Sequence, residues 1–239
     1  MNKLHFFILL SVGCWTQGLK AEIFTYPLDE VEALEIIGGI ELNVVCGEVN
    51  QLDISADTED AFSMSMTDKN LKIKSSKEGF WNLLSSNISP IGAELMVTRP
   101  PHTIDVSAGS EVEMPNCYKN QDNLDLAVHA GSSFTLKGDA GSIDRLEVDI
   151  SSGSEVGITA SLEINHLTLE ASSGAEFNTR KSVVINNASV KISSGASAEI
   201  CGTLAISGRA SSGGEVNVSE ATKLSDIRTN SGGSIEPNC

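Results

Sequence analysis

Apolar and polar residues alternate on both sides of a recurring glycine through the second half of the chain. In Val148-Asp-Ile-Ser-Ser-Gly-Ser-Glu-Val156 the glycine follows two serines, and similar segments occupy residues 170–177 and 190–198. The spacings between these glycines are 22, 22, 21, 21, 18 and 19 residues, which is the self-similarity expected of a solenoid. The glycines are Gly109, Gly131, Gly153, Gly174, Gly195, Gly213 and Gly232.

The residues at fixed distances from each glycine show what one repeat contains. Around Gly153 the apolar residues are Val148, Ile150, Val156 and Ile158, with other residues between them. This period of two is typical of a strand with one buried face, so a strand is predicted on each side of the glycine. A further apolar pair in the central turns predicts a third short strand, at Leu162/Ile164, Val183/Ile185 and Leu204/Ile206.

The predicted strands are too close in sequence for ordinary β-α-β units. No helix-period segment separates them, and a crossover helix needs more residues than remain. The repeat therefore predicts an all-β fold, a parallel β-helix of about seven turns that stack about 4.8 Å apart. A glycine at each corner lets the chain turn sharply, and stability is expected to come from the stack because one turn cannot bury its apolar face alone.

Residues 22–101 show short alternating strands without the glycine repeat, and they are predicted to form a β-strand cap over the first turn. Asp68-Lys-Asn70 is a plausible hairpin turn between two of the strands. Arg99-Pro-Pro101 is a short rigid step rather than a linker, so the cap and the β-helix of residues 102–239 are predicted to form one continuous domain, 22–239. The predicted cap strands are Ala33–Ile37, Ile40–Val45, Leu52–Ser55, Phe62–Met66, Leu71–Lys74 and Ala93–Val97.

The first 21 residues have the features of a secretory signal peptide. Lys3 precedes the apolar run 6–12, and Leu19-Lys-Ala21 resembles a cleavage site. The alternative is a lipoprotein anchored through Cys14, but Ser11 stands where a lipobox usually has an aliphatic residue. We therefore expect an exported protein, in the periplasm, on the outer surface or outside the cell. The apolar run is too short to span a bilayer, so no integral membrane protein is predicted.

Four cysteines remain after the predicted cleavage, and their even number in an exported protein favours two disulfides. The preferred pairs are Cys46 with Cys117 and Cys201 with Cys239, although three pairings are possible and free thiols are the alternative. Two turns of the predicted stack measure about 9–10 Å, so the second pair requires the C-terminus to fold inward. The cysteine spacing matches no zinc motif.

The net charge of −16 argues against nucleic acid and anionic membranes as partners. Acidic residues are spread along the repeats, whereas a polysaccharide lyase or hydrolase needs a local cluster. Glu155 and Glu176 are predicted to stack in neighbouring turns, where a solvated acidic face is favoured over a Ca²⁺ site. The serine column is expected to bond to the backbone rather than to hold nucleophiles. We therefore predict no catalytic, cofactor-binding or metal-binding residues.

Two further features bear on binding. Phe80 and Trp81 are adjacent aromatic residues beside Gly79, and they could form a binding tip or cover the core of the cap. The outward position four residues before each glycine changes from acidic to basic along the chain. Its residues are Asp105, Ala127, Asp149, Glu170, Lys191, Arg209 and Arg228.

Residues 151–156 and 172–177 share the pattern Ser-Ser-Gly-[Ala/Ser]-Glu-[Val/Phe]. Such turns after a strand-rich N-terminal region resemble the head GIN domain family of putative autotransporter adhesins, which are secreted bacterial proteins built on right-handed β-helices. The resemblance covers about Ile36 to Ile235. It implies a non-enzymatic, adhesin-like module whose partner is a protein or glycan at the cell envelope. A carbohydrate-active enzyme and a structural scaffold of the envelope are the alternatives.

Overall fold

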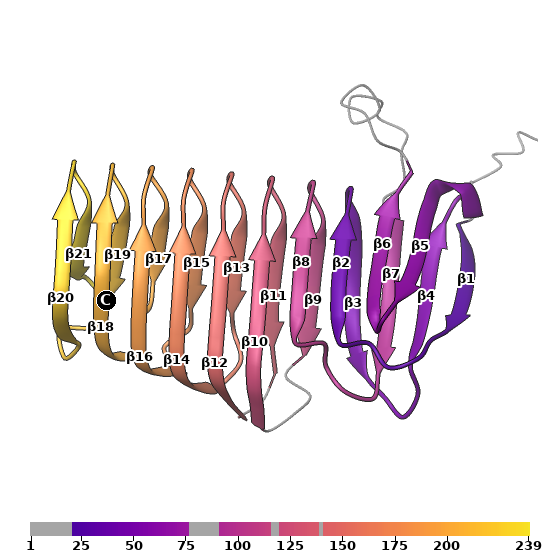
Figure 1. Cartoon of the computed structure of the whole chain (residues 1–239), viewed down its shortest axis with the longest axis horizontal. Coiled ribbons are helices and arrows are strands. Elements are labelled where there is room, and N and C mark those ends of the chain that lie inside the picture. The colour runs from indigo at the N-terminus through magenta and orange to yellow at the C-terminus, as the bar shows by residue number, and fades with distance from the viewer. Residues whose placement is uncertain (1–20, 77–90, 116–119, 139–140) are drawn as a thin grey trace, which may run out of the picture.

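The computed structural model describes residues 21–76, 91–115, 120–138 and 141–239, which form two sheets wound around one core (Figure 1). The chain ascends in one sheet, turns at a corner, descends in the other and advances by one strand, which is a right-handed coil. This arrangement confirms the predicted parallel β-helix. No described residue lies in an α-helix, and no described helix could cross a membrane.

The sheet of long strands, sheet 1, has ten strands among the described residues. In spatial order they are β20 (Lys223–Asn230), β18 (Thr203–Ser211), β16 (Val183–Ile192), β14 (Leu162–Ala171), β12 (Gly141–Ile150), β10 (Asn120–Val128), β8 (Thr103–Ser107), β2 (Ala33–Ile37), β6 (Asn70–Ser75) and β5 (Phe62–Thr67).

The sheet of shorter strands, sheet 2, has eleven strands within the same described ranges. In spatial order they are β1 (Glu22–Pro27), β4 (Gln51–Ala56), β7 (Ile91–Val97), β3 (Ile40–Cys46), β9 (Glu111–Pro115), β11 (Ser133–Lys137), β13 (Glu155–Ile158), β15 (Glu176–Thr179), β17 (Ser197–Glu199), β19 (Glu215–Val218) and β21 (Ser234–Pro237). A short 3-10 helix, η1 (Glu59–Ala61), connects β4 to β5.

The core is an aliphatic column between the sheets. Ile150 is fully buried and pairs in register with Val128 and Ala171, as the alternation predicts. Phe134 and Phe177 are the largest fully buried side chains. Each such residue contributes about 1.5–3 kcal/mol through removal of apolar surface from water, before conformational entropy is subtracted.

The predicted third short strand is not separate, and this prediction is wrong. Leu162 and Ile164 begin β14, which continues to Ala171 with one bend where Asn165 and His166 both leave the core. The side chains at this bend stack across turns: Asn165 Nδ2 donates to Asp144 Oδ1 at 3.0 Å, and the next asparagine repeats the contact. Two consecutive outward residues shift the phase of the alternation, which makes one bent strand look like two.

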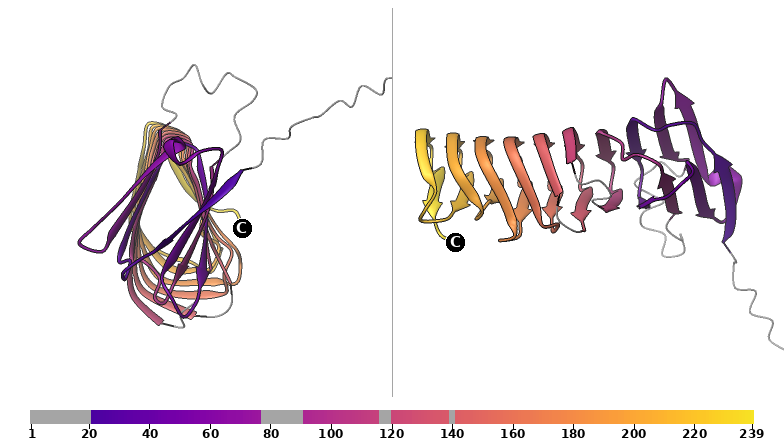
Figure 2. Two further views of the ribbon diagram at one scale, coloured as in Figure 1. Left: turned by 90° about the vertical axis from the view of Figure 1, so that its right-hand side faces the viewer. Right: turned by 90° about the horizontal axis from the view of Figure 1, so that it is seen from below.

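The parallel stack extends further toward the N-terminus than the glycine repeat indicates. β2 pairs in parallel with β8 and β6, and β3 pairs in parallel with β9 and β7. The strands β5, β4 and β1 then close this end by antiparallel pairing (Figure 2). Gly38 and Gly39 both have positive φ and form the corner between β2 and β3. This corner lies 70 residues before Gly109, so the regular spacing conceals it.

The coil narrows toward the C-terminus (Figure 2). The residue after each corner glycine changes from buried Ser154 through Ala175 and Ala196 to Gly214. A Cβ added at Gly214 would lie 2.8 Å from the backbone of Ile192, so only glycine fits between these two turns. The spacing of the corner glycines decreases from 22 to 18 residues over the same part of the chain.

Candidate functional site

The seven predicted glycines lie at the corners between sheet 1 and sheet 2, with φ between +69° and +78°. The residue before each of them also has positive φ, and Ala175 N donates to Ser172 O across one such corner at 3.2 Å. Two consecutive residues with positive φ inside an i to i+3 hydrogen bond define a type I′ turn. The corner therefore favours glycine at the second of these two positions, while a small residue occupies the first.

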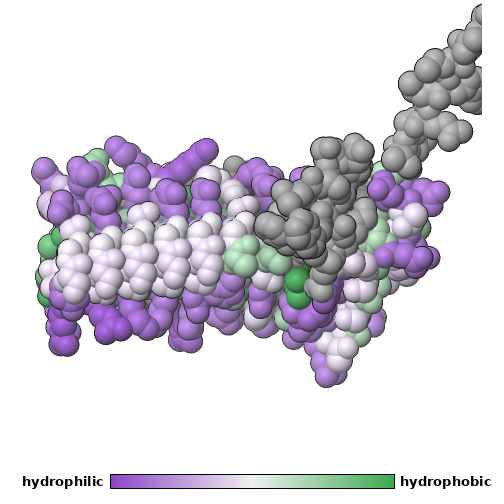
Figure 3. Space-filling model, turned by 90° about the horizontal axis from the view of Figure 1, so that it is seen from above, coloured by the Kyte–Doolittle hydropathy of each residue, from purple (hydrophilic) through white to green (hydrophobic). Residues whose placement is uncertain are grey.

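The corners are also hydrogen-bonded to one another along the rod. Gly153 N donates to Ser173 O at 3.0 Å, and Gly174 N donates to Ser194 O at 3.1 Å. In the early turns a buried serine reinforces the ladder, since Ser132 Oγ accepts from Ser110 N at 3.2 Å. The result is a straight ridge of small residues with strongly polar residues on both sides (Figure 3).

The cysteines predicted to pair near the C-terminus are joined: the Cα atoms of Cys201 and Cys239 lie 5.7 Å apart in a disulfide. The required inward fold of the terminus is present, because the two Cα atoms lie much closer together than the two turns that separate their repeats would place them. Cys46 is also disulfide-bonded. Its predicted partner, Cys117, lies outside the described residues, as do Phe80, Trp81 and nearly all of the predicted signal peptide.

The acidic column on sheet 2 is a solvated surface. Glu155 and Glu176 are exposed and adjacent in register, as predicted. Two glutamates of the column accept a hydrogen bond from the asparagine two residues further along the chain: Asn178 Nδ2 donates to Glu176 Oε1 at 2.8 Å, and Asn217 Nδ2 donates to Glu215 Oε1 at 3.0 Å. Within the described ranges, no group of three or more His, Cys, Asp or Glu residues could hold a metal ion.

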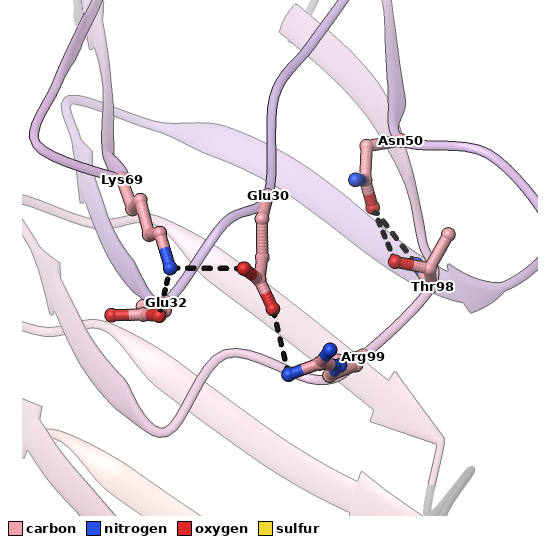
Figure 4. A network of polar contacts seen from close by, with 6 residues as sticks. All are labelled: Glu30, Glu32, Asn50, Lys69, Thr98 and Arg99. Carbon is pink, nitrogen blue, oxygen red and sulfur yellow. Dashed lines mark hydrogen bonds and ion pairs between the residues drawn. The ribbon is translucent and has the colours of Figure 1, made fainter.

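A network of ion pairs connects three segments near the N-terminal end (Figure 4). Lys69 Nζ lies 2.9 Å from Glu30 and 2.5 Å from Glu32, and Arg99 lies 3.0 Å from Glu30. The hydrogen bond from Lys69, followed by the charge of Arg99, lowers the pKa of Glu30, and the carboxylates raise the pKa of Lys69. All four side chains are solvent-accessible, so this network orients the β5–β6 turn without adding much stability.

A second polar group lies on the outer face of sheet 1. Asp105 is adjacent in register to Glu35, which forms a 2.7 Å ion pair with Lys72. Partial burial, together with the charge of Glu35, raises the pKa of Asp105, while His129 and Lys72 oppose the shift. Asp105 is therefore a carboxylate in an unfavourable position.

The outer face of sheet 1 has a hollow of about 320 Å³ over β14, β16, β18 and β20, which we call the basic hollow. Two rows of outward side chains form its walls. One wall contains the hydroxyls of Thr168 and Ser189, which are adjacent in register. The floor between the rows includes the backbone of Gly208.

The second wall of the basic hollow is a row of charges in register. Glu170, Lys191, Arg209 and Arg228 follow one another on neighbouring strands. Lys191 lies 2.7 Å from Glu170, and Arg228 lies 3.2 Å from Asp226, so both outer cations have an acidic partner. Arg209, between them, is exposed and contacts no carboxylate of the chain that the structure describes.

Two irregularities shape this hollow. Gly208 replaces the apolar residue found at this position in the other turns, and its φ is +132°. A Cβ there would lie 2.0 Å from Val190 O, so the two strands approach closely. The pairing of β18 with β20 shifts between Ile206 and Gly208, and Asp226 on β20 has a φ of +46°. Such bulges redirect side chains.

The basic hollow lies at the C-terminal end of the rod, which is much less acidic than the rest. Residues 180–239 hold six basic and five acidic side chains, whereas residues 22–179 hold eight basic and 27 acidic ones. The sequence shows the change from acidic to basic at the outward position but does not indicate a site there. Gly208, a glycine at a position that is apolar in the other turns, is the signal in the sequence that could have located the hollow.

Comparison with protein families gives one match. The family described as putative auto-transporter adhesin, head GIN domain, matches residues 31–222. No protein with a curated description matches the chain.

Solved structures with the same architecture exist at low sequence identity. A putative adhesin from Bacteroides fragilis has a TM-score of 0.72 and 13% identity over 90% of this chain and 96% of its own. A putative adhesin from Parabacteroides distasonis has a TM-score of 0.72 and 13% identity over 91% and 96%. A protein from Parabacteroides distasonis described as a putative lipid binding protein has a TM-score of 0.60 and 13% identity over 90% and 96%. At this identity the likeness shows the fold.

Proposed function

Because the chain belongs to the head GIN domain family of putative auto-transporter adhesins, we propose that it is an exported, non-enzymatic binding module of the cell envelope. In this proposal residues 1–21 are a signal peptide, and residues 22–239 form one continuous domain with a cap at 22–101 and the β-helix at 102–239. The partner is a protein or a glycan at the envelope.

The observation that carries the proposal is the regular outer surface of the rod. Outward side chains of equivalent positions lie on neighbouring strands, as Lys191 and Arg209 do in sheet 1. Strand spacing sets their separation at about 4.8 Å. Because the strands of the central turns are hydrogen-bonded on both sides, the backbone that carries these rows is already ordered before a ligand binds. Such a surface suits an extended partner with repeating groups.

Binding can be tested with purified protein of residues 22–239 on a glycan array and in pull-downs from envelope extracts. We expect a saturable interaction that disappears when the protein is unfolded. The alternative, a carbohydrate-active enzyme, is tested by following cleavage of neutral and acidic polysaccharides. Turnover that is lost on replacement of a single carboxylate would contradict the proposal.

Export is tested on the full-length protein. We expect mature protein that begins near Glu22 and lies outside the cytoplasm. N-terminal sequencing that finds Met1 retained, or a lipid on Cys14, would contradict this part of the proposal.

A further inference from the structure

We propose that the basic hollow binds an acidic saccharide, whose acid group lies on Arg209 between Lys191 and Arg228. This assignment rests on the proposed binding function and gives it a location and a ligand class. The chain has a net charge of −16, so a row of three cations is an exception on its surface. On an otherwise acidic surface, this row of cations is the place that would attract an anionic ligand.

Without a bound anion, repulsion between neighbouring cations in this row destabilises the folded protein. Lys191, Arg209 and Arg228 lie on three consecutive strands in register, about 4.8 Å apart. Like charges directly opposite each other across strands are destabilising. Glu170 and Asp226 compensate the two outer cations. The uncompensated charge is that of Arg209, and its planar guanidinium can donate two parallel hydrogen bonds to a carboxylate or sulfate.

The other wall of the hollow suits the rest of a sugar. Thr168 and Ser189 present hydroxyls that can both donate to and accept from sugar hydroxyls. Gly208 contributes no side chain, which leaves the floor open where the two strands approach closely. A volume of about 320 Å³ is within the range of small-molecule sites. A cationic wall that faces a hydroxyl wall matches a ligand with an acid group on one side and hydroxyls on the other.

The test uses the folded protein of residues 22–239 and defined probes. Trigalacturonate supplies carboxylates, and a chondroitin sulfate hexasaccharide also carries sulfate. The methyl ester of trigalacturonate supplies the same sugar without charge, and inorganic phosphate supplies an anion without sugar. Binding is measured by calorimetry at low salt and at 0.5 M salt.

Two variants locate the site. Arg209→Gln should weaken binding of the acidic saccharide about 10- to 100-fold, the range for loss of a charge-assisted hydrogen bond. Arg145→Gln removes an equal charge from the outer face of sheet 1, outside the hollow, and should have little effect. Without ligand, the unfolding midpoint of Arg209→Gln should equal or slightly exceed that of the unchanged protein, because repulsion within the row is relieved.

The inference is supported if at least one acidic saccharide binds more tightly than the methyl ester, and if Arg209→Gln, but not Arg145→Gln, abolishes the difference. It is overturned if neither acidic saccharide binds better than the ester, or if both variants weaken binding equally. Phosphate that binds as tightly as the saccharides would overturn the sugar assignment. Glycan or protein binding that survives Arg209→Gln would overturn this site but leave the proposed function intact, whereas absence of any partner would overturn both.

Discussion

Substitution of Gly153 separates backbone strain from crowding at a corner. Its φ is +69°, and no atom outside its chain neighbours lies within 4 Å of an added Cβ. A side chain at this position therefore costs only the energy of the left-handed conformation, about 1–2 kcal/mol for alanine. Asparagine tolerates this conformation and should cost less, whereas β-branched valine should cost more. The expected order of stability is Gly, Asn, Ala and Val.

Gly214 provides the matched contrast. Its φ lies outside the left-handed region, but a Cβ would lie 2.8 Å from the carbonyl carbon and oxygen of Ile192. Gly214→Ala should therefore destabilise through a backbone clash, and Gly214→Asn should be at least as damaging. The two glycines are thus expected to respond in opposite ways to the change from alanine to asparagine.

Urea unfolding followed by circular dichroism measures these differences, with comparison of midpoints at an unchanged slope. The decisive quantity is the midpoint difference between the Asn and Ala variants at each site. If Gly153→Asn is as destabilising as Gly153→Val, the corner is not held in the left-handed conformation. The type I′ turn, and the account of why glycine recurs there, would then be wrong.

Three further outcomes are expected from the stack, the outer face and the terminus. Ile150→Asp places a charge in the aliphatic column and should lower the unfolding free energy by several kcal/mol, whereas Glu155→Gln should be neutral or mildly stabilising; equal damage from both would show that the register is wrong. The folded state raises the pKa of Asp105, so its contribution to stability is present below the unfolded pKa and is lost as pH rises through the folded pKa. Compared with the unchanged protein, Asp105→Asn should therefore be more stable at pH 7 than at pH 3. A difference in urea midpoint that is the same at both pH values would contradict the shift. Cys239→Ser should cost about 2–4 kcal/mol under oxidising conditions and nothing under reducing conditions, and an equal loss in both would point to a packing defect instead.

The repeated part of the fold could be predicted because two independent features of the sequence, the alternation and the spacing of the glycines, indicate the same structure. Alternation around Gly153 gives the strands, the constant spacing gives the stack, and the structure places Ile150 between the residues expected from both. The position of the N-terminal strands could not be predicted in the same way. Gly38 and Gly39 form an equivalent corner, but intervening strands separate it from the regular series, and no periodicity links it to Gly109.

The basic hollow shows a second limit. The columns place Lys191 and Arg209 on neighbouring strands, but the glycine spacing does not reveal that the extra residue of the last turn lies in β20, opposite Ser207. Asp226, which lies at this insertion and has a φ of +46°, forms the ion pair with Arg228, so the insertion affects which cations of the row have an acidic partner. A repeat pattern predicts the positions that the turns share, so it cannot predict a local insertion in one strand.

The interleaving of β2 and β3 between later turns has a consequence for the order of folding. Leu126 pairs with Ile104 across 22 residues, whereas Ala33 pairs with Thr103 across 70. Closing the longer loop costs about 1 kcal/mol more in chain entropy, and the pairing of β2 and β3 with β8 and β9 offsets this cost only after β8 and β9 have formed. The regular turns can add one after another. The strands β2 and β3 can pair with β6 and β7 earlier, but they join the regular turns only when β8 and β9, up to residue 115, have been made. The N-terminal strands and the regular turns are therefore expected to form as separate units, and the junction between β2, β3 and the strands β8 and β9 is expected to form more slowly because its pairings are less local.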